Sequence, residues 1–517
     1  MVHIPHPRIV LGAIIGVQCA LRLIYVSQRD CPLPPAPDEA HYWLWSQQLS
    51  YWYYSKGPVV AWLIAAGQRL GDWLGLTPLA GLRLGAIVCG NLTLLALYAL
   101  SAMTLRCEQL ALRTVLVVCC MPVFAAGSIL MTIDAPLVCV WAWAIVAGYR
   151  AIHSDRVAWW VVVGWLGCLG VLTKPTMLLI LPTLALAARV QGQGWGGPLL
   201  AGCIASLGLV PMLVWNAQHH WLTVRHIATQ AGWTEQPVGL LGLLTFGAGQ
   251  LAVTLGFWLI AWLRALASYT HGRLCSAGEQ YLVCCSLPVL GFFAAHSLLK
   301  PALPNWPMPA YLAALPLTVA WLHGHASRWA RRFAWLICLL GLGLTLLAHF
   351  PQPLRPALAV WATRLAGDDP FPLRRLDPTW RLCGWPTLAQ AIEQIRAQLR
   401  RAGDEPIVAV TEWTIAGELS FHLPDRPTVY TLGRLVRDRF CQCDLIEPHP
   451  FATPQPFVGK TFIIVGYLST ELADLFADVG PVQEICHWEG AMPIRGWRVQ
   501  ICTGYRGLSQ RVDVNRF

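Results

Sequence analysis

Long apolar runs separated by short polar segments dominate the first 349 residues. A helix needs about 20 residues, most of them apolar, to cross the hydrocarbon core of a bilayer. We expect eleven membrane-spanning helices, over the apolar runs 9–26, 79–101, 111–128, 133–149, 157–173, 176–190, 197–215, 238–263, 279–299, 306–322 and 332–349. The pattern predicts a mainly α, polytopic membrane domain over residues 1–349.

The pattern changes after residue 350. Five prolines between 351 and 372 indicate a linker, and the segments that follow alternate amphipathic helices with short β-rich runs, which is typical of a small α/β domain. We expect helices at 387–402, 413–422 and 470–477, and strands at 406–411, 428–431, 461–466 and 496–502. Residues 350–517 are therefore predicted to form a second, soluble domain.

Composition and charge narrow the classes of protein. Of the 517 residues, 56% are hydrophobic and 12% are charged, which excludes an ordinary soluble fold and a disordered chain. Residues 1–349 contain 19 Lys and Arg against 9 Asp and Glu, and residues 350–517 contain 18 of each, so the whole net charge of +10 lies in the apolar domain. A nucleic-acid partner is not predicted because the soluble part is neutral. The predicted partner is the bilayer itself.

The distribution of arginines between the loops sets the predicted orientation. Arginines are somewhat more frequent in every second loop, starting with the loop after the second span, and cytoplasmic loops carry such an excess. We therefore expect a multi-pass protein of the cytoplasmic (inner) membrane with a cytoplasmic N-terminus. The odd number of spans then places the C-terminal domain outside the cytoplasm.

Candidate chemistry lies in the loops on the predicted outer side. The longest, 27–78, contains Asp38 and Glu39 at the start of a short aromatic segment. Asp38 is expected at or near the N-cap of an interfacial helix, with Glu39 in its first turn. These two carboxylates are either helix-capping groups or the acid–base groups of a catalytic site.

Further polar residues of the outer loops are Tyr54 and Lys56, in the same first loop, and Asp134, Lys174, His219, Arg225, Lys300 and Asn305. Asp134 also has a structural interpretation as a helix cap, and Lys174 and Lys56 as interfacial anchors. Three histidines near 220 lack a carboxylate at ligand spacing, so no metal-binding residues are predicted. No cofactor is indicated, and dependence on a divalent metal stays open.

Several short segments resemble those of a known enzyme family. They are Pro37-Asp38-Glu39-Ala40-His41-Tyr42-Trp43, Tyr53-Tyr54-Ser55-Lys56-Gly57-Pro58, Thr132-Ile133-Asp134-Ala135-Pro136-Leu137, Leu172-Thr173-Lys174-Pro175, Trp215-Asn216-Ala217-Gln218-His219, Asn305-Trp306-Pro307 and Arg381-Leu382-Cys383-Gly384-Trp385. In this order they resemble the GT-C glycosyltransferases, in particular the bacterial protein-mannosyltransferase-like family (glycosyltransferase family 39 type) and the related aminoarabinose transferases of lipid A.

The resemblance implies an inverting glycosyltransferase that moves a hexosyl or pentosyl group from a polyprenyl-phosphate donor to a lipid, glycan or protein acceptor outside the cytoplasmic membrane. It implies that Asp38 is the base and that Glu39 and Asp134 orient the acceptor or the base. Lys56, with Lys300 or Arg225, is expected to hold the donor phosphate. Tyr54, Lys174, His219 and Asn305 complete the expected substrate-binding set, and the polyprenyl tail is expected between spans.

Two other classes of protein fit a polytopic chain. A lipid-linked sugar transporter or flippase would place ionisable groups near the bilayer midplane and often has internal repeats, whereas the spans here are nearly free of charge and Arg22 is the clearest exception. A non-catalytic envelope assembly protein would not need the combination of Asp38, Glu39, Lys56 and Asp134. The enzyme is the favoured hypothesis.

Overall fold

The structure is a computed structural model that describes residues 5–154, 156–230, 232, 237–270, 276–367 and 369–508. The chain forms two compact units. The first contains Met1–Arg29 and Ser50–Leu346, and the second contains Asp30–Leu49 and Leu347–Phe517. The boundary between Leu346 and Leu347 lies close to the domain boundary predicted at residue 350. Residues 30–49, which the sequence analysis placed in the first domain, pack instead with the C-terminal part of the chain.

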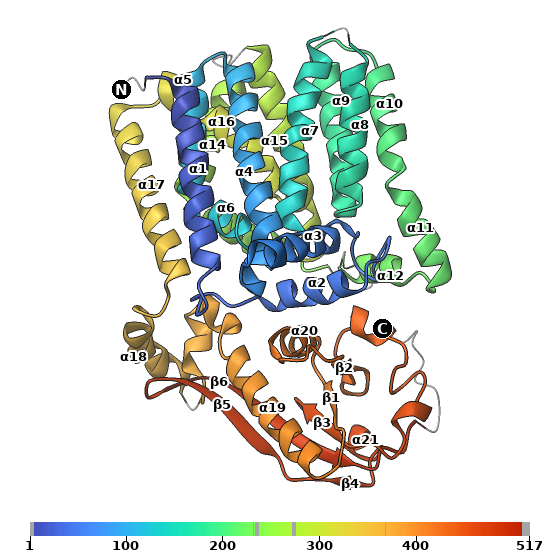
Figure 1. The fold of residues 1–517 in the computed structure, drawn as a ribbon. Coiled ribbons are helices and arrows are strands. Elements are labelled where there is room, and N and C mark those ends of the chain that lie inside the picture. The colour runs from blue at the N-terminus through green and yellow to red at the C-terminus, as the bar shows by residue number, and fades with distance from the viewer. Residues whose placement is uncertain are drawn as a thin grey trace. The chain divides into compact units, whose positions relative to one another are not determined.

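The first unit is a bundle of helices (Figure 1). In chain order these are α1 (Pro7–Val26), α3 (Val59–Leu74), α4 (Pro78–Leu105), α5 (Glu108–Cys119), α6 (Pro122–Gly127), α7 (Asp134–Ile152), α8 (Ala158–Val171), η1 (Pro175–Leu179), α9 (Ile180–Val190), α10 (Gly196–Ser206), α11 (Leu209–Gln218), α12 (Leu222–Gln230), α13 (Leu240–Val253), α14 (Phe257–Thr270), α15 (Ala277–His296), α16 (Met308–Gly324) and α17 (Arg328–His349).

Every predicted apolar run is helical, but the runs differ in length. Within the described residues, six helical segments are long and apolar enough to span a membrane: α1, α4, α7, α10 with α11, α15 and α17. The run 238–263 is a bent pair, in which α13 and α14 meet at 106°. The remaining runs form shorter or broken helices, such as α5 and α6. These helices support a multi-pass membrane protein.

Burial distinguishes the inside of the bundle from its outer faces. Of an apolar stretch of 18 residues in each helix, 89% is buried in α7, whereas 17% is buried in α1 and 22% in α17. The exposed faces of α1 and α17 carry leucines, isoleucines and valines such as Ile9, Val17, Leu336 and Leu339. Apolar residues that face outward are stable against lipid, so α7 is central and the other two helices are peripheral.

The second unit is an α/β domain with one six-stranded sheet. Its elements are α2 (Pro37–Gln47), α18 (Arg355–Ala366), η2 (Pro372–Arg375), η3 (Pro378–Leu382), α19 (Trp385–Arg401), β1 (Ile407–Val410), α20 (Trp413–His422), β2 (Tyr430–Thr431), η4 (Gly433–Val436), η5 (Gln442–Leu445), η6 (Gln455–Phe457), β3 (Phe462–Val465), α21 (Thr470–Ala473), β4 (Asp478–Val479), β5 (Gln483–Glu489) and β6 (Met492–Thr503).

The strand order is β2-β1-β3-β6-β4, and β5 pairs with β6. β1 is parallel to β2 and β3, whereas β6 is antiparallel to β3, β4 and β5. All four residues of β3 are buried because one face packs with α19 and α20 and the other packs with α21 and nearby aromatics. Burial on both faces explains the continuous apolar runs of β1 and β3.

Candidate functional site

A carboxylate at the start of α7 binds two side chains from other loops. Asp134 is the first residue of α7, and its Oδ1 accepts a hydrogen bond from Lys174 Nζ at 3.2 Å. Its Oδ2 accepts a second bond from Asn305 Nδ2 at 2.5 Å. The side chains of Asp134 and Lys174 are 20% and 10% exposed, so this ion pair is largely removed from water. Three predicted site residues therefore form one network.

The local backbone explains why the three residues meet. Lys174 precedes the proline that starts η1, and Asn305 lies in the turn before α16. The Lys174 ammonium also lies 5.7 Å from the centre of the Trp306 ring, a favourable cation–π distance. Asp134 thus holds a cation and an amide in place.

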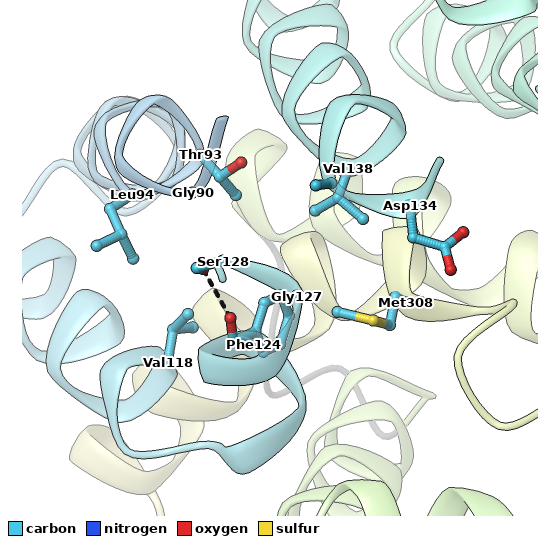
Figure 2. A pocket seen from close by; sticks show the side chains of 11 residues that line it. Gly90, Thr93, Leu94, Val118, Phe124, Gly127, Ser128, Asp134, Val138 and Met308 are labelled. Carbon is cyan, nitrogen blue, oxygen red and sulfur yellow. Dashed lines mark hydrogen bonds between the residues drawn. The ribbon is translucent and has the colours of Figure 1, made fainter. Parts of the chain in front are cut away.

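A cavity of about 30 Å³ lies beside Asp134, large enough for a water molecule. Figure 2 shows Asp134 and Val138 on one side of it, with Ser128 and Thr93 among the other residues that line it. The hydroxyls of Ser128 and Thr93 donate to the carbonyls of Phe124 and Cys89. Among the residues that line this cavity, Asp134 is the charged one.

Two other predicted lysines converge on the end of α12. Lys56 Nζ donates to Gln230 Oε1 at 3.2 Å, and Lys300 Nζ donates to the Thr229 carbonyl at the same distance. The C-terminal end of a helix favours cations because its last carbonyls carry partial negative charge. Lys56 and Lys300, 244 positions apart in the sequence, therefore contact neighbouring residues and concentrate positive charge.

The loop with Lys56 also approaches the loop with Lys174. A Cβ at Gly57 would lie 1.8 Å from the Leu172 carbonyl oxygen, and Val59 N–H donates to that same oxygen at 3.4 Å. Only glycine allows this approach of two backbones. The loops that carry Lys56, Lys174 and Lys300 are therefore held near one another, and the last of them also carries Asn305.

The segment before α12 is fixed by its own side chains. The Asn216 amide oxygen accepts the N–H groups of Thr223 and Val224, at 3.0 and 3.4 Å. The His219 ring stacks on Trp215, with centroids 4.0 Å apart, and its Nδ1 lies 2.9 Å from the Trp215 carbonyl. These contacts give His219 a structural role beside the substrate-binding role expected for it.

Aromatic contacts join the loop that carries Lys56 to α12. The rings of Tyr54 and His226 are 5.3 Å apart and meet edge to face, and Trp52 Nε1 donates to Thr223 Oγ1 at 3.2 Å. Arg225, on α12, is exposed in the structure. Tyr54 and Arg225 therefore belong to the region that Lys56 and Lys300 define.

Asp38 and Glu39 lie in the second unit, on α2, and differ in their surroundings. The helix begins at Pro37, and Glu39 Oε2 accepts the N–H of the N-cap residue Ala36 at 2.9 Å. Asp38 therefore lies two positions after the N-cap, near the cap as expected, and the buried Glu39 of the first turn makes the capping contact. Asp38, in the first turn, is exposed.

Helix α2 packs closely on α20. A Cβ at Gly417 would come within 2.7–2.9 Å of backbone atoms of Ala40 and His41, so the two helices cross at a position where only glycine fits. The His41 ring meets the ring of Trp413 edge to face, at 5.5 Å. Burial lowers the pKa of His41 to about 3, with a smaller contribution from Arg439, so the imidazole is neutral at physiological pH.

Several partners of the predicted residues were not predicted from the sequence. Gln230, Thr229 and Trp306 contact Lys56, Lys300 and Lys174, respectively. Of these three, only Trp306 could have been found from the sequence, because it follows Asn305 in one of the segments that resemble the enzyme family. Among the described residues, no group of three or more His, Cys, Asp or Glu is placed to hold a metal ion.

Known proteins match the chain in sequence. The family described as dolichyl-phosphate-mannose-protein mannosyltransferase matches residues 55–215. The lipid A galacturonosyltransferase RgtD of Rhizobium johnstonii is 30% identical over 296 residues, which are 55% of this chain. The chain spans 60% of the length of that relative.

Solved structures match nearly the whole chain. ArnT from Cupriavidus metallidurans bound to undecaprenyl phosphate has a TM-score of 0.60 and 15% identity, over 95% of this chain and 97% of that one. Its apo state has a TM-score of 0.55 and 17% identity, with the same coverage. These matches confirm the GT-C fold and the resemblance to the protein-mannosyltransferase-like glycosyltransferases.

Proposed function

We propose that the protein is an integral-membrane inverting glycosyltransferase that uses a polyprenyl-phosphate sugar as donor. The observation that carries the proposal is the convergence of three lysine-bearing loops in an apolar helical unit with the GT-C fold. An apolar bundle suits a polyprenyl chain, and a concentration of cations suits its phosphate.

The chemistry of such a transfer defines what the residues must supply. The acceptor oxygen attacks the anomeric carbon, the bond from that carbon to the phosphate oxygen breaks, and the polyprenyl phosphate leaves as an anion. Cations that stabilise the developing charge on the phosphate accelerate this step. We assign this role to Lys56, supported by Lys300 or Arg225.

An acceptor hydroxyl must also lose its proton. We assign this general-base role to Asp38, which is exposed in the first turn of α2. Glu39 Oε2 accepts the N–H of Ala36 in the helix cap, which supports an orienting role for Glu39. Asp134 is occupied by Lys174 and Asn305, which supports an orienting role for all three. Tyr54 and His219 are assigned to substrate binding in the region around α12.

The proposed acceptor is a lipid of the lipid A class, located on the outer face of the inner membrane. The support for it is the relative that is named a lipid A galacturonosyltransferase. Glycan and protein acceptors are alternatives, and each is supplied in place of lipid A in the same transfer assay. The sugar is proposed as a hexose, hexuronic acid or pentose, to be identified by the donor that reacts.

The test is transfer by the purified protein. Undecaprenyl phosphate-linked uronic acid, neutral hexose and pentose are supplied in turn with lipid A, and mass spectrometry detects the product. Asp38→Asn is expected to lower the rate 10²–10⁴-fold without loss of thermal stability. Asp72→Asn, an exposed acid of the same predicted loop, is the matched control and should retain activity.

Two results would overturn parts of this proposal. No product from the wild-type protein with any of the three donors, on lipid A, envelope glycan or protein acceptors, would reject the glycosyltransferase assignment. Turnover of Asp38→Asn at the wild-type rate would move the base to another residue, with Asp134 and Glu39 next to be tested.

A further inference from the structure

A second pocket lies in the first unit, among different helices. It is formed by α5, α14, α16 and α17 and has a volume of about 60 Å³. None of the residues contributed by the described chain to its lining is acidic, whereas two arginines and a histidine line it. Asp134, Lys174 and Lys56 are not among them, so the pocket is separate from the proposed catalytic region.

The basic groups of this pocket gather around one residue. Arg113 Nη1 lies 3.2 Å from His323 Nδ1, and Arg331 Nη1 donates to the His323 carbonyl at 3.4 Å. Two guanidinium groups are thereby held close to the same point at the end of α16. Guanidinium groups present planar sets of N–H donors that match the oxygens of a phosphate.

The rest of the lining is apolar and extends along the helices. Trp258 and Cys338 are buried, and Trp335 is half exposed on the outer surface of α17. Arg331 and Cys338 are seven residues apart on one helix, so the lining covers about 10 Å along the helix axis. A cationic end joined to an apolar floor has the polarity of a phospholipid, with its charged head group and acyl chains.

The bilayer supplies such a molecule at this surface. Both α17, which forms one wall, and the exposed Trp335 belong to the outer face of the bundle. Aromatic side chains of this kind are enriched at the level of the head groups. Basic pockets between membrane helices bind anionic head groups, because charge and apolar contact act together.

We propose that the pocket lined by Arg113, His323 and Arg331 is a binding site for an anionic phospholipid. The lipid phosphate contacts the two guanidinium groups, and one acyl chain packs on Trp258 and along α17. The site is independent of the donor polyprenyl phosphate and of the glycosyltransferase reaction. It gives the bundle a bound lipid that stabilises the packing of α17 on α5 and α16.

The test compares lipids that differ only in head group. The full-length protein in detergent is incubated with equal amounts of phosphatidylglycerol and phosphatidylcholine of the same acyl chains, and native mass spectrometry counts each bound lipid. We expect a preference for phosphatidylglycerol that falls about tenfold or more in Arg113→Gln/Arg331→Gln. The matched control is Arg328→Gln/Arg332→Gln, which removes two exposed arginines of α17 that do not line the pocket.

Each outcome decides the proposal. Equal binding of the two lipids by the wild-type protein would overturn it, and so would an equal loss in both double variants, which would indicate a general effect of charge. Displacement by excess inorganic phosphate would assign the pocket to a free anion. Should the arginine variant fail to fold, Ala334→Leu fills the apolar floor and is expected to lower phosphatidylglycerol binding with both arginines present.

Discussion

Lys174 donates a hydrogen bond to Asp134 across 3.2 Å, although the two residues lie forty positions apart, just before η1 and at the start of α7. Neither side chain is more than 20% exposed. A largely buried charge that loses its partner costs more than the pair contributes, because the remaining charge has no water to solvate it. The pair therefore holds the start of α7 and the segment before η1 together.

This relationship predicts non-additive effects of substitution. Lys174→Met and Asp134→Asn are each expected to lower the free energy of unfolding by about 1–3 kcal/mol. The double variant should be no less stable than the less stable of the two single variants, because removing both charges leaves no unpaired charge. The wild type, the two single variants and the double variant form a double-mutant cycle. Their apparent melting temperatures are measured in the same detergent. Additive losses would show that the ion pair contributes nothing.

The position of Lys56 beside Gln230 predicts an effect on donor binding. Lys56→Ala should weaken the binding of undecaprenyl phosphate by about 1.5–3 kcal/mol, or roughly 10- to 150-fold, because a charge-assisted contact is lost. Lys56→Arg should retain most of the affinity. Gln230→Leu is the control, since it removes the contact seen in the structure and leaves the charge. Equal affinity of wild type and Lys56→Ala would reduce Lys56 to an interfacial anchor.

Because α2 and α20 cross at Gly417, we predict that replacing this glycine by alanine destabilises the protein, which is the opposite of the usual effect in a helix. Replacing a helical glycine by alanine ordinarily stabilises a helix by about 1 kcal/mol. At Gly417 the added methyl would overlap the backbone of Ala40 and His41, so we expect destabilisation by about 1–3 kcal/mol. Hydrogen exchange should become faster in residues 37–47. Gly291→Ala, a helical glycine with open space around it, is the control and should cause no loss.

Gly417→Ala also relates the C-terminal unit to the proposed reaction, since α2 carries Asp38. Turnover should fall while the affinity for the donor stays unchanged, because the variant moves the proposed base and not the lysines. Unchanged hydrogen exchange and turnover in this variant would show that α2 tolerates displacement from α20.

His449 predicts a loss of stability in acid. Its Nδ1 accepts the N–H of Phe451 at 3.1 Å, and burial lowers its pKa to about 4 from 6.5. The folded state therefore binds fewer protons than the unfolded state between pH 6.5 and 4, so its stability falls as the pH decreases through that range. The loss from this group is on the order of 3 kcal/mol.

His449→Asn isolates the effect, because the asparagine oxygen can accept the same N–H and does not titrate. Melting temperatures are measured from pH 7.5 to 4 for both proteins. We expect the wild type to lose more stability than the variant as the pH falls below about 6.5. Parallel curves would mean that His449 titrates normally in the folded protein.

Local features of the sequence were sufficient to predict much of the fold. All eleven apolar runs are helical, and the predicted helix 413–422 has the same limits as α20. The strands β1 and β3 lie within the predicted segments 406–411 and 461–466. Apolar length, proline position and β-branched runs act within a few residues of the chain, so a sequence shows them directly.

The strands β4 and β5 were missed because they mix polar and apolar residues, none of which is buried. Strand β5 owes its place to pairing with β6, from Gln483 with Val499 to Glu489 with Met492. Pairing of this kind depends on the partner strand, so the composition of the segment alone does not predict it.

The sequence by itself determined an apolar helical domain, an α/β domain and the polar residues in the loops between the apolar runs. Only the tertiary structure decided which of these residues meet: Asp134 with Lys174 and Asn305, and Lys56 and Lys300 with the end of α12. It also decided that residues 30–49, with Asp38, pack with the C-terminal unit. Those contacts join segments far apart in the chain, and their geometry follows from the packing of whole helices, which no local pattern encodes.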